Sequence, residues 1–190
     1  MILNLNTKYI GKQIEFYETI RSTQDRAKEI LLEENIKDNG KIVVANIQTN
    51  GRGTNSRTWY TDGENIAITI ILYPQNRNIS EFKDFTINIA ECMKKAIQKT
   101  YDINLEIKKP NDLILNGKKI GGILTESTLL KETVKTLLVG VGFNVQKSVF
   151  EEEIKDLATS LKKEYKNIEF DRDIIVAKFL EEFENMYNNI

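Results

Sequence analysis

The sequence predicts an α+β fold in which helices pack on a mixed, largely antiparallel sheet. Strand-like runs rich in β-branched residues alternate with longer segments of helical periodicity. The dipeptide Asn116-Gly117, the strongest short-range signal of a hairpin, joins two of these runs. Neither a repeat nor a Pro/Gly-rich linker divides the 190 residues, so we expect residues 1–190 to form a single domain.

The first half of the chain is expected to contain three strands and one helix. The run Ile42-Val43-Val44-Ala45 is β-branched and apolar, which is typical of a buried strand. The third strand ends at Pro74, because proline lacks the amide hydrogen that a sheet ladder needs. The expected segments are strands at 13–17, 42–45 and 65–73 and a helix at 25–34.

The second half is expected to contain three helices and four strands. Ser80 begins the first helix, which runs to about Thr100, because apolar side chains recur at helical spacing after it. The run Glu151-Glu152-Glu153 predicts the solvated start of a helix. The expected segments are helices at 80–100, 157–165 and 171–187 and strands at 103–108, 113–115, 118–127 and 134–145, the last two antiparallel.

Composition indicates a compact globular protein, since 41% of the residues are hydrophobic and 29% are charged. Lysine and arginine total 27 against 28 acidic residues, so no overall field draws nucleic acid or an anionic membrane. The chain has no apolar run long enough for a membrane span and no signal-peptide core, which predicts a cytoplasmic location. Cys92 is the only cysteine, so no intrachain disulfide can form.

The chain contains no histidine, which excludes several kinds of active site. A Ser-His-Asp triad, a Cys-His dyad and a histidine-ligated metal are all impossible. A P-loop pattern is also missing, which excludes a Walker-type nucleoside triphosphatase (NTPase). A reaction that depends on positioning and charge stabilisation fits this set of residues best.

A glycine loop shortly after the 42–45 strand is the first candidate site. It reads Gly51-Arg52-Gly53-Thr54-Asn55-Ser56-Arg57-Thr58-Trp59 and has no acidic residue. Glycines let the backbone approach a ligand, successive amide hydrogens bind anions, and arginine adds bidentate recognition of oxyanions. For the loop alone, a solvated hairpin turn is the alternative.

The second candidate site is the segment Lys108-Lys109-Pro110-Asn111-Asp112-Leu113. Pro110 is expected to stop a strand, so that Lys108 ends one strand and Lys119 opens another. A rigid scaffold would then direct both ammonium groups into a cleft. The alternative is that Lys108, Lys109, Lys118 and Lys119 cover a solvent-exposed face.

These segments and several others occur in an order that resembles a known family. Along the chain come Ser22-Thr23-Gln24, Gln48, Gly51-Arg52-Gly53 with Arg57 and Trp59, Lys108-x-Pro-Asn-Asp-Leu, Lys119-x-Gly-Gly-Ile-Leu and Val139-Gly140-Val141-Gly142-Phe143-Asn144. The series is similar to the signature of biotin–protein ligases, also called holocarboxylase synthetases, from residue 15 to residue 185. It implies a class II synthetase-like biotin/lipoate ligase catalytic domain, without the N-terminal DNA-binding domain or the C-terminal SH3-like barrel of some members.

The resemblance also implies an activity. Biotin and ATP, with Mg²⁺, would form biotinyl-5′-AMP and pyrophosphate, and a lysine of a biotin carboxyl carrier domain would then take the biotinyl group and release AMP. Two alternatives stay open, a lipoate–protein ligase-like enzyme and a degenerate, non-catalytic binding domain of the same fold. In some members a sheet edge forms a homodimer, and the long apolar strand at 134–145 is expected to be such an edge.

The resemblance assigns a role to each candidate residue. Lys119, Arg52 and Lys108 are the expected catalytic residues, since two anions must be neutralised as they approach. Ser22 and Thr23 would bind the ureido ring of biotin, although Ser22 before Asp25 also fits a helix N-cap. The expected biotin-binding set is Ser22, Thr23, Gln24, Gln48, Gly51, Arg52, Gly53, Thr54, Lys119, Gly121 and Gly122. The expected ATP-binding set is Arg52, Arg57, Trp59, Lys108, Asn111, Lys119 and Asn144, with Asn111 and Asp112 as Mg²⁺ ligands.

Two residues depart from the family pattern. Thr54 stands where many members carry a basic residue, and Lys109 replaces a large apolar residue before Pro110. The first departure is expected to weaken retention of the adenylate, and the second to alter a wall of the biotin pocket.

Overall fold

The computed structural model describes residues 4–33, 38–54, 57–63 and 65–190. Its strands are β1 (Ile14–Ile20), β2 (Ile42–Gln48), β3 (Thr61–Asp62), β4 (Asn65–Leu72), β5 (Glu106–Lys108), β6 (Asp112–Leu115), β7 (Lys118–Leu130) and β8 (Thr133–Asn144). They form an eight-stranded sheet in the order β1-β2-β4-β8-β7-β6-β5, with β3 paired to β2. Among the described strands, β1 and β2 are parallel and every other pair is antiparallel, which confirms the predicted mixed, largely antiparallel sheet.

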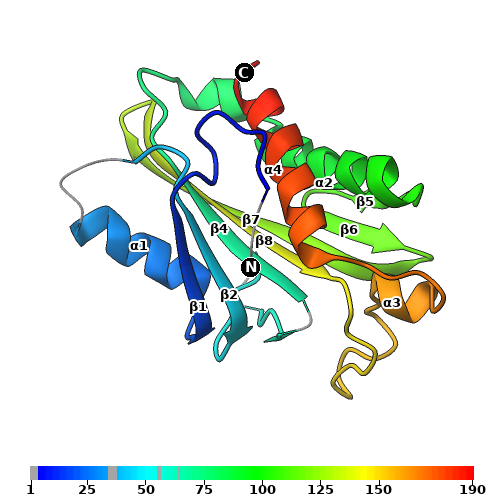
Figure 1. The fold of residues 1–190 in the computed structure, drawn as a ribbon. Coiled ribbons are helices and arrows are strands. Elements are labelled where there is room, and N and C mark those ends of the chain that lie inside the picture. Colours follow the sequence, from blue (N-terminus) through cyan, green and yellow to red (C-terminus); the bar gives the residue numbers. More distant parts are fainter. Residues whose placement is uncertain (1–3, 34–37, 55–56, 64) are drawn as a thin grey trace.

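The α-helices of the described residues are α1 (Thr23–Glu33), α2 (Phe85–Tyr101), α3 (Leu161–Glu164) and α4 (Arg172–Tyr187). Helices α2 and α4 pack together on one face of the sheet, and α1 lies on the opposite face (Figure 1). Because side chains alternate along a strand, β4 contributes to both faces. Its Ile68 and Ile70 join a large core with α2 and α4, whereas Ile71 joins a smaller cluster beneath α1.

The hairpin predicted at Asn116-Gly117 is confirmed. Both residues have positive φ, 50° and 77°, as a two-residue type I′ turn between antiparallel strands requires. The turn fixes the register of β7 on β6 and places Lys119 at the second position of β7. Lys108 is the last residue of β5, as the sequence predicted.

The helix predicted from Ser80 is wrong at its start. Ile79–Phe82 forms a 3-10 helix, η2, and α2 begins only at Phe85. Asn78, rather than Ser80, caps η2, because its Oδ1 accepts a hydrogen bond of 2.9 Å from the Ser80 amide. The strand predicted at 103–108 is also too long, because Ile103 and Leu105 are buried in the core ahead of the ladder that begins at Glu106.

The helix predicted at 157–165 is wrong in its first half. The Lys119 amide donates to the Leu157 carbonyl at 2.8 Å, and the Thr159 amide donates to the Lys119 carbonyl at 2.9 Å. This segment therefore pairs in parallel with the start of β7 instead of forming a helix. The Ser160 hydroxyl then caps α3 by accepting from the Lys163 amide at 3.0 Å. The run Glu151–Glu153 does not begin a helix either and lies in a series of turns.

The strand predicted as an exposed edge is not one. β8 lies between β4 and β7, where both of its sides are paired, so β8 cannot form a homodimer by edge pairing. The ends of the described strand order are β1 and β5. Glu34, the predicted end of the first helix, lies outside the described residues. A search of the described helices finds none with the length and apolar character that a membrane crossing needs.

Candidate functional site

Three neighbouring strands, β4, β8 and β7, form a trough on the sheet face that carries α1. The register places Ala67 of β4 beside Gly142 of β8, and Gly142 beside Gly122 of β7. Because two of these three residues have no side chain, the backbone itself forms the floor of the trough. The next row across the same strands consists of Thr69, Gly140 and Leu124.

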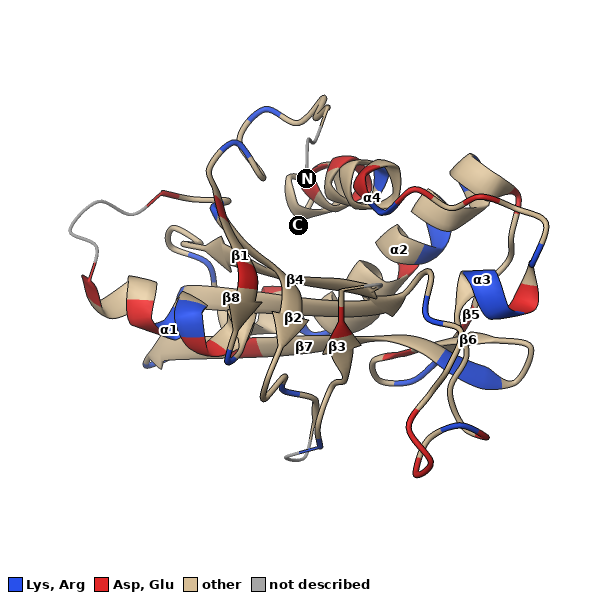
Figure 2. Cartoon of the chain, turned by 60° about the horizontal axis from the view of Figure 1, so that its bottom comes forward, with Lys and Arg blue, Asp and Glu red and all other residues tan. Residues whose placement is uncertain are grey.

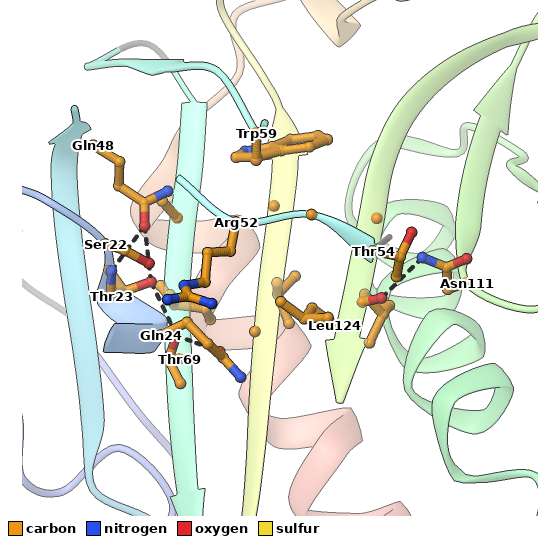
Figure 3. A pocket seen from close by; sticks show the side chains of 18 of the residues that line it. Ser22, Thr23, Gln24, Gln48, Arg52, Thr54, Trp59, Thr69, Asn111 and Leu124 are labelled. Atoms are coloured by element: carbon orange, nitrogen blue, oxygen red, sulfur yellow. Dashed lines mark hydrogen bonds between the residues drawn. The ribbon is translucent and has the colours of Figure 1, made fainter. Parts of the chain in front are cut away.

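The indole of Trp59 lies over this trough (Figure 3). A Cβ at Gly142 would collide with the indole, so only glycine permits their contact. The indole Nε1 is buried and has no hydrogen-bond partner among the described residues. The cavity left beside the indole measures about 40 Å³, which holds roughly three water molecules. A larger ligand therefore requires the loop that carries Trp59 to move.

The side of the trough next to α1 is lined by neutral polar side chains (Figure 3). Gln48 Oε1 accepts hydrogen bonds from the amide and the hydroxyl of Thr23, at 2.8 and 3.1 Å. Gln24 Oε1 accepts one from the Thr69 hydroxyl at 3.1 Å. Ser22 lines the cavity and also caps α1, since its Oγ lies 3.4 Å from the Asp25 amide. Both interpretations of Ser22 therefore agree with the structure.

A carboxylate that the sequence did not single out orients Gln24. Glu126 Oε2 accepts a hydrogen bond of 2.7 Å from Gln24 Nε2, and Lys28 Nζ donates to the other oxygen at 2.7 Å. Burial raises the pKa of Glu126, but the hydrogen bonds from Lys28 and Gln24 outweigh burial and leave the pKa below its ordinary value. The charged carboxylate fixes the Gln24 amide with its oxygen toward Thr69. No local motif marks Glu126, because it lies 102 residues from Gln24 in the sequence.

The glycine loop is a narrow hairpin in the described residues. The Trp59 amide donates to the Gly51 carbonyl at 2.9 Å, and the Gly53 amide donates to the Arg57 carbonyl at 2.7 Å. A Cβ at Gly51 would collide with the Trp59 carbonyl, which explains this glycine. Arg52 Nε lies 2.6 Å from the Asp25 carboxylate beside the trough, whereas Arg57 is exposed. Asn55 and Ser56 lie outside the described residues.

Lys119 reaches the other end of the trough. Its Nζ lies 2.6 Å from Asp112 Oδ1, and the Lys119 side chain is 31% exposed. A Cβ at Gly122 would stand 3.4 Å from the Lys119 Nζ, so glycine leaves room for the ammonium group above the strand. Asn111, also at the trough, donates from Nδ2 to the Ile123 carbonyl at 3.1 Å. The Lys119–Asp112 ion pair therefore stands at one end of the cavity, and Arg52, paired with Asp25, lies near the polar side chains at the other end.

A second cavity, of about 240 Å³, adjoins the first. The two share Gly53, Thr54, Trp59 and Lys119, so Lys119 borders both. Its other walls come from residues 57–60, from Asn144 at the end of β8, and from a largely apolar set in the segment after β8. The lining residues that it does not share with the first cavity are Arg57, Thr58, Tyr60, Asn144, Lys147, Phe150, Ile154, Leu157 and Ala158.

Most of the predicted site residues line one of these two cavities. Ser22, Thr23, Gln24, Gln48, Arg52, Gly53, Thr54, Asn111, Lys119 and Gly122 line the first, and Arg57, Trp59 and Asn144 line the second, which Trp59 shares with the first. Four predicted residues line neither cavity. Lys108 is exposed at the end of β5, Gly51 lines a neighbouring surface groove, and Gly121 packs against Phe143 on the core face. Asp112 is outside both cavities as well, but it pairs with Lys119 at 2.6 Å. Lys109, whose departure was expected to alter a wall, is exposed and lines neither cavity.

The second cavity also contains residues that the sequence did not reveal. Lys147, Phe150, Ile154 and Leu157 belong to the segment whose acidic run predicted a solvated helix. The apolar residues interspersed with Glu151–Glu153 were the signal that this segment covers something.

The two predicted Mg²⁺ ligands, Asn111 and Asp112, both carry side-chain oxygen atoms. Hard cations take one or two carboxylates plus phosphate oxygens and water, so a set of one amide and one carboxylate fits. The Asn111 amide group donates from its nitrogen, which leaves its oxygen as an acceptor. The described residues contain no cluster of three or more acidic or thiol side chains that could bind a metal without a substrate.

Comparison with known proteins agrees with this geometry. A model of the biotin/lipoate A/B protein ligase family matches residues 16–144. The chain is 34% identical over 188 residues to the bifunctional ligase/repressor BirA of Bacillus subtilis, covering 97% of this chain and 57% of that protein. It is 34% identical over 170 residues to the biotin–protein ligase of Homo sapiens, covering 86% of this chain and 23% of that protein.

The fold is similar to that of solved ligases. The biotin protein ligase of Aquifex aeolicus, in complex with biotin and ATP, superposes with a TM-score of 0.78 at 30% identity, over 94% of this chain and 71% of that chain. The chain spans little more than half the length of the Bacillus relative. Because the family model covers more than half of the chain, the chain belongs to the biotin/lipoate A/B protein ligase family.

Proposed function

We propose that the chain catalyses ATP-dependent ligation of biotin to a lysine of a biotin carboxyl carrier domain, through biotinyl-5′-AMP. The observation that carries the proposal is the position of Lys119, which borders both cavities. A reaction between a carboxylate and a phosphate needs one cation within reach of both anions. The Aquifex relative, described in complex with biotin and ATP, supports the same pair of substrates.

The first cavity suits biotin. Its ureido ring is neutral and polar, so it requires hydroxyl and amide partners, as Ser22, Thr23 and Gln48 provide. The apolar ring system and valeryl chain would lie along the trough between Gly142 and Gly122. The carboxylate would then reach Lys119, with Arg52 as a second cation at the loop.

The second cavity suits the nucleotide, whose base and sugar would pack on Trp59, Phe150 and Ile154. A biotin carboxylate oxygen attacks the α-phosphorus, the bond to the bridging oxygen of pyrophosphate breaks, and pyrophosphate leaves. Lys119 would hold both oxyanions as they meet, and Asn111 and Asp112 would hold Mg²⁺, which neutralises phosphate charge. The acceptor lysine amine then attacks the biotinyl carbonyl and AMP leaves. Because ATP is an intracellular substrate, we place the reaction in the cytoplasm.

Calorimetry and a pyrophosphate-release assay test the proposal. The chain should bind biotin, release pyrophosphate only with biotin and ATP together, and then label a carrier domain. Lipoate-dependent release would favour a lipoate ligase instead. Biotin binding without any release of pyrophosphate would favour a non-catalytic domain.

A further inference from the structure

Lys147, which follows β8, is a buried lysine between two carboxylates. Its side chain is 3% exposed, and its Nζ lies 2.6 Å from Asp62 Oδ2 and 2.9 Å from Glu151 Oε1. Lysine is almost never this buried unless it is paired. Burial lowers the pKa of Lys147, but the hydrogen bonds with Asp62 and Glu151 outweigh burial and leave the pKa raised. The ammonium group therefore stays charged at neutral pH.

The two carboxylates belong to different parts of the chain. Asp62 lies on β3, directly after the glycine loop, whereas Glu151 lies in the segment 149–157 that walls the second cavity. The Tyr60 hydroxyl makes a parallel link, donating to Glu153 Oε2 at 3.1 Å. Figure 2 shows the glycine loop and the segment 149–157 projecting from the sheet on the side away from α2 and α4.

The segment 149–157 has few other polar connections to the fold. In the described chain, its backbone hydrogen bonds are internal, except that the Leu157 carbonyl accepts from the Lys119 amide at 2.8 Å. Phe150 is buried against the Lys147 and Lys163 ammonium groups, 5.6 and 5.0 Å from its ring centre. The segment 149–157 is therefore tied to β3 and the residue before it by two polar links, one from Glu151 through Lys147 to Asp62 and the other from Glu153 to Tyr60.

Lys147 is not placed to bind a phosphate. Together with Asp62 and Glu151 it makes a cluster of net charge minus one, which repels an anion. The same cluster suits a structural tie, because a buried ammonium group with two carboxylates strongly resists the loss of either partner.

We infer that Lys147 is a positioning residue that fastens the segment 149–157 to β3 and so holds Phe150 and Ile154 against the second cavity. The inference rests on the proposed function, since it assumes that the nucleotide occupies this cavity. Because Asp62 and Tyr60 immediately follow the glycine loop, the tie also couples the position of this segment to that of the loop.

The test compares Lys147→Met with Lys155→Met. Lys155 lies in the same segment, but it is 48% exposed and pairs with the exposed Glu152. Lys147→Met should raise the KM for ATP about tenfold, with kcat and the Kd for biotin changed less than twofold, because opening the wall reduces the binding-competent population. Lys155→Met should change none of these three constants. Hydrogen exchange without substrates should be faster in 149–157 for Lys147→Met alone.

Asp62→Asn tests the same tie from the other side and should reproduce these effects. The double variant with Lys147→Met should have no higher KM for ATP and no faster exchange in 149–157 than Lys147→Met alone, because both substitutions remove the same contact. If Lys147→Met does not fold, Asp62→Asn decides the question. Equal KM values and equal exchange in the variants and the unsubstituted chain would overturn the inference while leaving the proposed function intact. Failure of the unsubstituted chain to release pyrophosphate would instead refute the proposed function. Hydrogen exchange in 149–157 would then still show whether Lys147 fastens this segment to β3.

Discussion

Lys119 combines two roles that a single substitution can separate. It pairs with Asp112 at 2.6 Å in the folded protein and borders both cavities. Lys119→Ala should lower biotinyl-AMP formation by about 10²–10³-fold, because one preorganised charge partner is lost from the transition state. Biotin affinity should fall much less. Single-turnover pyrophosphate release and calorimetry measure the two effects, with Lys118→Ala as the control at the neighbouring position of β7.

Near-normal pyrophosphate release by Lys119→Ala would show that Lys119 has no catalytic role. If release falls as expected, thermal melting separates the loss of catalysis from loss of the fold, since the substitution leaves the partly buried Asp112 without its lysine.

Gly142 and Gly121 offer a matched pair of substitutions, because a Cβ at each would meet an aromatic ring. At Gly142 the ring is Trp59, which belongs to a loop, and at Gly121 it is the buried Phe143. Gly121→Ala should lower the free energy of unfolding by about 1–3 kcal/mol through overpacking. Gly142→Ala should leave stability nearly unchanged and weaken biotin binding instead, because the loop can move and the trough becomes shallower. Denaturant unfolding and calorimetry distinguish the two, and equal loss of stability in both would contradict this assignment.

Among the structural elements, the glycine loop is the one expected to respond most to ligands. Trp59 leaves only about 40 Å³ of the trough open. Under the proposed function, biotin would therefore displace the indole on entry, and the loop would then close over the bound anions. Amide exchange at Arg52–Thr54 and Arg57–Trp59 should slow when biotin and ATP are added together. The α2 amides serve as the internal reference, and unchanged exchange in the loop would argue against a lid.

The elements that the sequence predicted correctly depend on local chemistry. Asn116-Gly117 determines its hairpin through the φ angles that the turn needs, and α2 follows from the spacing of its apolar side chains. The errors come from partners distant in the sequence. The segment around Leu157 pairs with Lys119, some forty residues earlier, and the central position of β8 depends on β4 and β7. Glu126 and Lys147 were missed for the same reason, since nothing near them in the sequence marks their contacts.

At the scale of the whole molecule, one carboxylate joins the two ends of the chain. Glu184 of α4 is buried and accepts hydrogen bonds from the backbone amides of Lys8, Tyr9 and Ile10, at 2.6, 3.0 and 2.9 Å. Burial raises the pKa of Glu184, but the three amide hydrogen bonds outweigh it and hold the pKa below its ordinary value. The charged form of Glu184 therefore stabilises the fold.

Glu184→Gln should lower the free energy of unfolding at pH 7 by about 1–3 kcal/mol, since amide donors lose a charged acceptor. A depressed carboxyl pKa contributes stability that is fully present above the unfolded value, about 4.3, and is lost as pH falls through the folded value. The difference between the variant and the unsubstituted chain should therefore shrink below pH 4. Urea titrations between pH 3 and pH 7 measure it, with the exposed Glu152→Gln as control. A difference that does not depend on pH would contradict the assignment.

The backbone floor of the trough limits how this site can change by mutation. Ala67, Gly122 and Gly142 have almost nothing left to remove, so nearly every substitution there makes the site smaller. Acceptance of a bulkier acid must instead come from Trp59, Leu124 or the first turn of α1, where side chains can still be shortened. Variant libraries designed to change the substrate should therefore keep the floor residues and vary Trp59, Leu124 and the first turn of α1.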